Sequence, residues 1–208
     1  MNRTFLIFLM VGSAMMIAVL GQYKPHTQLN YTPWDIQIQD NGASRVFGLT
    51  LGKSNIQEAN QIFASFADTR LLIDESNQPV LVAHYNELVM DGIVADLELY
   101  YQLEPAVLEQ LHKDLVAIEN SQRQQTYKLP ADTEMDYLST PIARIVYKPA
   151  IQYGEELITQ RFGAPQQTVK VDDQQRHWLY PDSGLTISLF DGQQAEEFEY
   201  RPLKQPQS

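Results

Sequence analysis

The sequence contains no cysteine among its 208 residues. The chain therefore forms no disulfide bond, and its N-terminal segment offers no cysteine for lipidation. Positive charge is also scarce, because 15 lysines and arginines stand against 26 aspartates and glutamates, for a net charge of −11. A surface with this excess repels nucleic acids and anionic lipid head groups. We predict no nucleic-acid binding, and the excess favours solubility and a basic partner.

The few histidines show no metal-binding pattern. No two of them stand three or four residues apart, and none belongs to a cluster with cysteine and carboxylates of the kind that binds zinc. We therefore predict no bound metal. The four histidines are His26, His84, His112 and His177.

Residues 48–54 read Gly-Leu-Thr-Leu-Gly-Lys-Ser and approach a phosphate-binding loop. That motif has four residues between its glycines, whereas this segment has three. The spacing matters because the backbone N–H groups of such a loop must surround a phosphate. We interpret the segment as a strand and a turn that lead into a helix, with Ser54 as the N-cap and Gln57 completing a capping box. The sequence predicts no cofactor.

No pattern in the sequence identifies a nucleophile or an acid–base pair. The candidate serines lack a surrounding motif, and a hydrolase would need a base brought to them by the fold. The candidate acids are adjacent pairs, and neighbours on a helix or strand do not direct both carboxylates at one bond. We assign no catalytic residue, leave enzymatic activity open, and favour a role without it. The serines are Ser54, Ser139 and Ser183, and the acids are Glu155, Glu156, Glu196 and Glu197.

A charge-free N-terminal segment precedes the polar body. Twenty uncharged residues separate Arg3 from Lys24, and residues 5–20 are almost wholly apolar. As a helix these residues extend about 24 Å, a little short of the ~30 Å hydrocarbon core of a bilayer. We predict that residues 1–21 are an uncleaved anchor, with a cleaved signal peptide as the alternative. In both cases Arg3 keeps the N-terminus in the cytoplasm, and the body faces the far side of the membrane, which is the periplasm if the source is a Gram-negative bacterium.

The body reads as a linker, two similar halves and a tail. Period-two alternation predicts strands at 34–39, 45–51, 70–73, 80–85, 93–101, 142–147, 167–171, 177–180, 185–190 and 196–200, and helical spacing predicts helices at 54–66, 105–118 and 153–162. The predicted fold class is α+β: after the membrane-spanning or signal helix come one or two units in which helices pack on an antiparallel sheet. The segments are a linker (22–33), a first unit (34–121), a connecting segment (122–141), a second unit (142–201) and a flexible tail (202–208).

The second half carries a distinctive order of motifs. Residues 155–165 read Glu-Glu-Leu-Ile-Thr-Gln-Arg-Phe-Gly-Ala-Pro, and residues 177–185 read His-Trp-Leu-Tyr-Pro-Asp-Ser-Gly-Leu. A helix that ends in Phe-Gly-Ala-Pro, then a strand with Trp-Leu-Tyr and a turn, resembles the periplasmic helix-plus-meander domains of the SmpA/OmlA lipoproteins and of the β-lactamase-inhibitor-protein fold. The resemblance implies a binding or scaffolding role in the cell envelope. The chain departs from the lipoproteins because it lacks the lipidated cysteine.

Aromatic residues of the predicted strands are the candidate contact surface. Alternation places part of this set in the core and part on an open face of the sheet. Core packing against the helices is the preferred interpretation of the set as a whole, whereas tyrosine and tryptophan on an open sheet are typical of protein-binding surfaces. The candidate protein-binding residues are Trp178, Tyr180, Tyr100 and Tyr200.

These features together predict a non-enzymatic envelope protein that binds another, unidentified envelope protein or supports assembly. It is expected to be a single-pass inner-membrane protein with a periplasmic body, or a soluble periplasmic protein after cleavage. Two alternatives remain open. One is a cell-wall or lipid hydrolase that uses acidic residues, and the other is an inhibitor-like module for a secreted enzyme. A cleft with converging carboxylates or a Ser–His pair would favour the hydrolase, and an open sheet face would favour binding.

Overall fold

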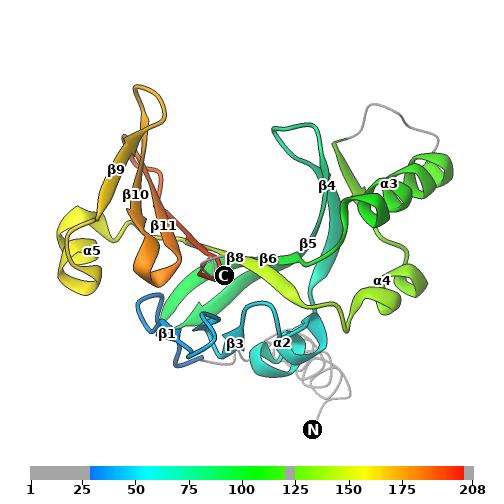
Figure 1. Ribbon diagram of the computed structural model, residues 1–208, viewed down its shortest axis with the longest axis horizontal. Helices are drawn as coiled ribbons and strands as arrows, with labels where there is room; N and C mark the ends of the chain where they lie inside the picture. The colour runs from blue at the N-terminus through cyan, green and yellow to red at the C-terminus, as the bar shows by residue number, and fades with distance from the viewer. Residues whose placement is uncertain (1–28, 120–124, 204–208) are drawn as a thin grey trace, which may run out of the picture.

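A nine-stranded antiparallel sheet runs through both halves of the body in this computed structural model, which describes residues 29–119 and 125–203 (Figure 1). The predicted α+β class with antiparallel sheets is confirmed. In spatial order the strands are β7 (Thr126–Lys128), β4 (Asp68–Ile73), β5 (Pro79–Met90), β6 (Ile93–Tyr101), β8 (Ile142–Pro149), β12 (Glu197–Tyr200), β11 (Leu185–Phe190), β10 (Gln175–Tyr180) and β9 (Gln167–Lys170).

Strand β8 joins the two halves of the sequence. On one side it pairs with β6, with Leu99 opposite Ile145 and Leu97 opposite Tyr147. On the other side it pairs with β12, where Tyr200 lies opposite Ile145. The sheet is therefore continuous across the two predicted halves.

The predicted anchor at residues 1–21 lies outside the described residues, as do most of the linker and most of the tail. Within the described part of the chain, no helix combines the length and the apolar character that a membrane crossing requires.

The sheet is bent into a trough (Figure 1). Strands β5, β6 and β8 form its floor, and the strands at either end of the sheet rise as walls. Two irregularities accompany the bend. Strand β5 has an extra residue between Tyr85 and Leu88 relative to β6, and β8 has an extra residue, Ala143, opposite Tyr100 and Tyr101 of β6. An extra residue on one strand bends that strand and increases its twist. We call the inner surface of the trough the concave face; His84, Glu98, Arg144 and Glu199 belong to it.

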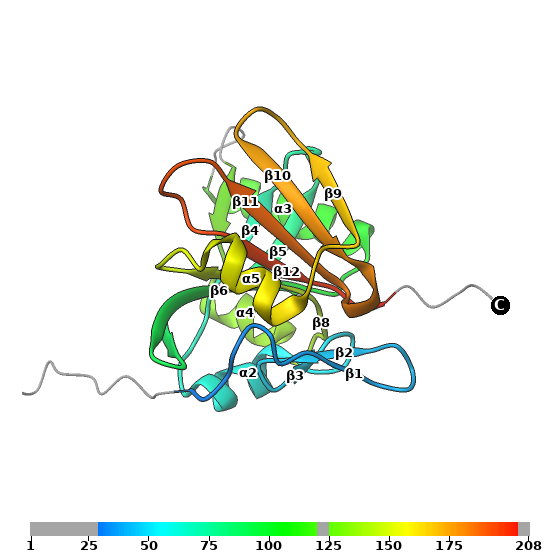
Figure 2. The same cartoon turned by 90° about the vertical axis from the view of Figure 1, so that its left-hand side faces the viewer.

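The helices and a small second sheet cover the outer, convex side (Figures 1 and 2). Most buried apolar side chains lie there, including Phe47, Tyr147, Phe198 and Tyr200. Strand residues that are buried alternate with residues that face the trough, as the period of two requires. The covering elements are α2 (Ile56–Phe63), α3 (Pro105–Glu119), α4 (Ala131–Tyr137), α5 (Gly154–Phe162) and the sheet of β1 (Gln37–Ile38), β2 (Ser44–Val46) and β3 (Leu49–Thr50).

The structure corrects the predicted start of the first helix. Asn55 is the N-cap of α2, because its Oδ1 accepts a hydrogen bond of 2.9 Å from the Glu58 N–H. The Ser54 hydroxyl instead accepts from the Thr50 N–H at 3.1 Å and closes the preceding turn. The helix ends at Phe63, so Phe66, predicted on its buried face, is 88% exposed.

Three further elements differ from the sequence prediction. Residues 45–51 form parts of two short strands, β2 and β3, because the chain reverses at Phe47 and Gly48, which have φ angles of 52° and 79°. Strand β7 and helix α4 lie in the segment predicted only as a connection. The remaining predicted strands and helices of the described chain are present within a few residues of their expected ends, and β5 runs on to Met90.

Candidate functional site: the concave face and its end pocket

The concave face carries charged side chains of both signs in equal number. Alternation and cross-strand register place five cations and five acids on it, so this face is close to neutral in a chain whose net charge is −11. The cations are Arg70, Lys128, Arg144, Lys148 and Arg201, and the acids are Asp68, Asp96, Glu98, Glu197 and Glu199.

Glu98 is the centre of one cluster on this face. Its Oε1 lies 2.6 Å from the Lys148 Nζ on β8, and its Oε2 accepts a hydrogen bond of 3.1 Å from the Tyr100 hydroxyl. The His84 Nδ1 on β5 lies 3.8 Å from the same carboxylate. The Glu98–Lys148 pair therefore links β6 to β8, and His84 of β5 lies close to the same carboxylate.

Glu199 is the centre of the second cluster. Its carboxylate accepts a hydrogen bond of 3.0 Å from the Arg144 Nη1, and the Arg201 Nε donates to its other oxygen. The Arg144 guanidinium also lies 3.5 Å from the centre of the Tyr100 ring, a cation–π contact that holds both side chains in place. Burial and the nearby Glu98 carboxylate raise the pKa of Tyr100, so its hydroxyl stays protonated and donates to that carboxylate.

His84 lies between acids on both neighbouring strands. Register places it opposite Asp68 on β4 and opposite Glu98 on β6. Burial lowers the pKa of His84, and the nearby cations Arg70 and Lys148 act in the same direction against the two acids. The His84 Nε2 is buried without a hydrogen-bond partner among the described residues.

The neighbouring carboxylate of Asp68 is held by cations. Burial opposes its ionisation, but Arg70 at 2.6 Å and Lys128 at 3.5 Å outweigh that cost and lower the pKa of Asp68.

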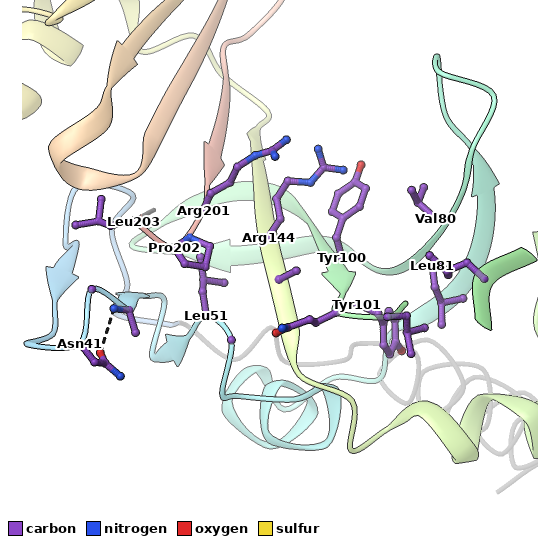
Figure 3. A pocket seen from close by; sticks show the side chains of 17 residues that line it. Asn41, Leu51, Val80, Leu81, Tyr100, Tyr101, Arg144, Arg201, Pro202 and Leu203 are labelled. Atoms are coloured by element: carbon purple, nitrogen blue, oxygen red, sulfur yellow. Dashed lines mark hydrogen bonds between the residues drawn. The ribbon is translucent and has the colours of Figure 1, made fainter. Parts of the chain in front are cut away.

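A pocket of about 750 Å³ opens at one end of the trough, where β6 ends and β8 begins (Figure 3). We call it the end pocket. Tyr100, Arg144 and Arg201 rise side by side at its polar edge. No carboxylate, serine or histidine is among the described residues that line it. Its larger aliphatic lining residues are Leu51, Val80, Leu81, Leu103, Leu108, Pro202 and Leu203.

Local structure explains how the end pocket is assembled. A one-residue bulge in β8, opposite the end of β6, leaves Ala143 without a cross-strand partner beside Arg144. The segment after β12 is fixed by backbone bonds, because the Arg201 N–H donates to the Gly184 carbonyl and the Leu203 N–H donates to the Gly42 carbonyl. The pocket thus combines segments that are far apart in the sequence.

The structure places the four predicted contact residues in two environments. Trp178, Tyr180 and Tyr200 are core side chains with exposed fractions of 8%, 5% and 0%. The Tyr180 hydroxyl donates to the Gly163 carbonyl, and the Tyr200 hydroxyl donates to the Pro33 carbonyl. Core packing, the interpretation preferred for the aromatic set, therefore holds for these three. Tyr100 alone lies on the concave face, at the end pocket.

The acids considered for hydrolysis have structural partners. Glu196 is buried, and its carboxylate accepts bonds of 2.9 Å from the N–H groups of Tyr153 and Gly154 at the start of α5. Glu155 pairs with Arg176 on the outer side. Within residues 29–119 and 125–203 no three histidines, aspartates or glutamates are grouped as a metal site would require.

Sequence reasoning missed Arg144, Glu199 and Arg201 as members of a site. The available signal was the alternation of charged and aromatic residues along 197–201, which identifies one polar face of a strand, whereas Val146 interrupts the same pattern along 144–148. Comparisons with known protein families, curated proteins and solved structures found no match.

Proposed function

We propose that this protein is a non-enzymatic binding module of the cell envelope, and that its concave face contacts a partner protein. The observation that carries the proposal is the concave face with charges of both signs, together with a pocket whose described lining is largely aliphatic beside Tyr100, Arg144 and Arg201. A polar rim around an apolar, water-excluding centre is the usual composition of a protein-binding surface. The end pocket, with its aliphatic lining, supplies an apolar patch of this kind at one end of the concave face.

The envelope location rests on the sequence. The apolar residues 5–20 support an inner-membrane anchor with the body in the periplasm, or a cleaved signal peptide and a soluble periplasmic protein. The resemblance of the second half to SmpA/OmlA-like domains supports the same compartment and a scaffolding role.

No observation favours the hydrolase. Each of the two carboxylates that centre the clusters of the concave face is bound by cations, and neither lines the end pocket. An inhibitor-like module would use the same face, and the partner's identity would distinguish it from an assembly factor.

Photo-crosslinking in intact cells tests the binding face. A photoreactive amino acid in the full chain replaces Thr186 or Leu179, which register places on the concave face. Matched variants carry it at Glu109 on α3 or Thr159 on α5, both exposed on the outer side. We expect an adduct of one defined mass from the two concave positions only. Adducts that arise equally from the outer positions, or none from the concave ones, would contradict the proposal.

A further inference from the structure

We propose that the end pocket binds the C-terminal residue of a partner polypeptide, with its carboxylate held by Arg144 and Arg201 and an aliphatic side chain on the leucine-rich lining. This inference rests on the proposed binding function and specifies the chemistry of the partner.

The charge at the pocket edge favours a monoanion. Arg144 and Arg201 share a single acid, Glu199, so the three side chains leave one positive charge in excess. That excess stands out in a chain with a net charge of −11. A carboxylate carries one negative charge and matches it, whereas a phosphate near neutral pH carries more.

The two guanidinium groups retain donors for a ligand. Each guanidinium has five N–H donors. Arg144 uses Nη1 and Arg201 uses Nε to bind Glu199, and no other hydrogen bond of these guanidinium groups is found to the described residues. Glu199 and the Tyr100 ring fix Arg144 in a defined orientation, which lowers the entropic cost of binding a carboxylate through paired N–H groups.

Apart from the polar edge, the lining of the end pocket favours a ligand with an apolar group next to its carboxylate. Leu103, Leu108, Pro202 and Leu203 supply the partly exposed aliphatic surface of the pocket. Pro202 and Leu203 lie next to Arg201 (Figure 3). A volume of about 750 Å³ is within the range of pockets that enclose small ligands and exceeds the needs of a simple carboxylate ion.

The position of the pocket favours a polypeptide over a fatty acid. The pocket lies at the end of the concave face, so a chain whose last residue occupies it would continue along the trough past Glu98 and Lys148. The preceding residues of a peptide can pair with these charges, whereas a fatty acid has no groups that would use them. Capture of a terminal carboxylate is a known mode of peptide recognition.

Fluorescence anisotropy with the full-length protein tests this assignment. The probe is a fluorescein-labelled octapeptide pool with leucine at its C-terminus, prepared as the free acid and as the amide. We expect the free acid to bind at least tenfold more tightly than the amide, because charge-assisted hydrogen bonds are lost in the amide. Equal binding of the two pools would overturn the proposal, and so would laurate that binds the protein as tightly as the free-acid pool.

Arginine variants locate the site. We expect R144Q and R201Q each to weaken binding of the free-acid pool about tenfold and to leave binding of the amide unchanged. Arg201 is largely exposed, so R201Q remains informative if R144Q fails to fold. R70Q is the matched control, because Arg70 is also an ion-paired arginine of this face but does not line the pocket. Loss of binding in R70Q equal to that in R201Q would overturn the assignment.

The two proposals can fail separately. If photo-crosslinking in cells gives adducts from the concave face but the peptide pools show no preference for the free acid, the pocket's role is refuted and the binding function stands.

Discussion

Glu196 links the loop before β12 to the first turn of α5. Its buried carboxylate accepts two backbone N–H groups that the helix itself leaves unpaired, at the positive end of the helix dipole. We expect Glu196→Ala to lower the free energy of unfolding by about 1–3 kcal/mol, because both donors lose their partner. Urea denaturation of the purified variant measures the change. Glu197→Ala is the control at the adjacent glutamate, and an equal loss in both variants would contradict the capping role.

His84 is expected to make the free energy of unfolding depend on pH. Burial lowers its pKa in the folded protein, Arg70 and Lys148 act with burial, and Glu98 and Asp68 oppose it. The unfolded chain therefore binds more protons as pH falls through the ordinary histidine value of about 6.5, so stability is lost on acidification. We expect His84→Gln to make the urea midpoint less dependent on pH between about pH 7 and 5. An unchanged dependence in this variant would show that His84 does not carry the effect.

At the scale of elements, the turn that precedes β11 holds residues 201–203, which line the end pocket, in place. Gly184 has a φ angle of 61°, and a Cβ at this position would lie 2.1 Å from the Arg201 carbonyl oxygen. We expect Gly184→Ala to destabilise the fold by more than ~2 kcal/mol, because the clash adds to the strain of the left-handed backbone. Thermal unfolding checks this value. Gly92→Ala is the control, since Gly92 also has a positive φ but a Cβ added there would meet no atom within 4 Å.

The elements that the sequence predicts well are those with a long regular pattern. Strand β6 alternates over nine residues, and α5 is stopped by Gly163 and Pro165. Strand β7 and helix α4 are too short to develop a clear period. The sequence predicts one strand in place of β2 and β3 because alternation continues through Gly48, where the positive φ reverses the chain.

The site is less predictable than the elements. Tyr100 is a candidate from the sequence because aromatic residues are frequent at the centres of interfaces. Arg144 and Glu199 are 55 residues apart and become neighbours only because β8 pairs with β12. No local pattern specifies that pairing. Trp178 and Tyr200, also contact candidates, lie in the core, since alternation identifies two faces but not which one the helices cover.

At the scale of the whole molecule, the continuous sheet leads us to expect a single cooperative unit. Ile145 is fully buried on β8, opposite Leu99 of β6 and Tyr200 of β12. We expect Ile145→Ala to cost about 2–5 kcal/mol, as for other large-to-small changes in a core. Because the residue packs between both halves, hydrogen exchange should accelerate to a similar degree in the amides of β4 and β5 and in those of β10 and β11.

The control for Ile145→Ala is Ile151→Ala, because Ile151 lies just beyond β8 and is 52% exposed. In the Ile151→Ala variant the amide hydrogen-exchange rates should change little, because shortening a half-exposed side chain leaves no cavity in the core. If Ile145→Ala accelerated exchange in one half only, the halves would be independent folding units despite their shared sheet. Equal acceleration would mean that a partner bound along the concave face stabilises both halves at once, because mass action then acts on one folding equilibrium.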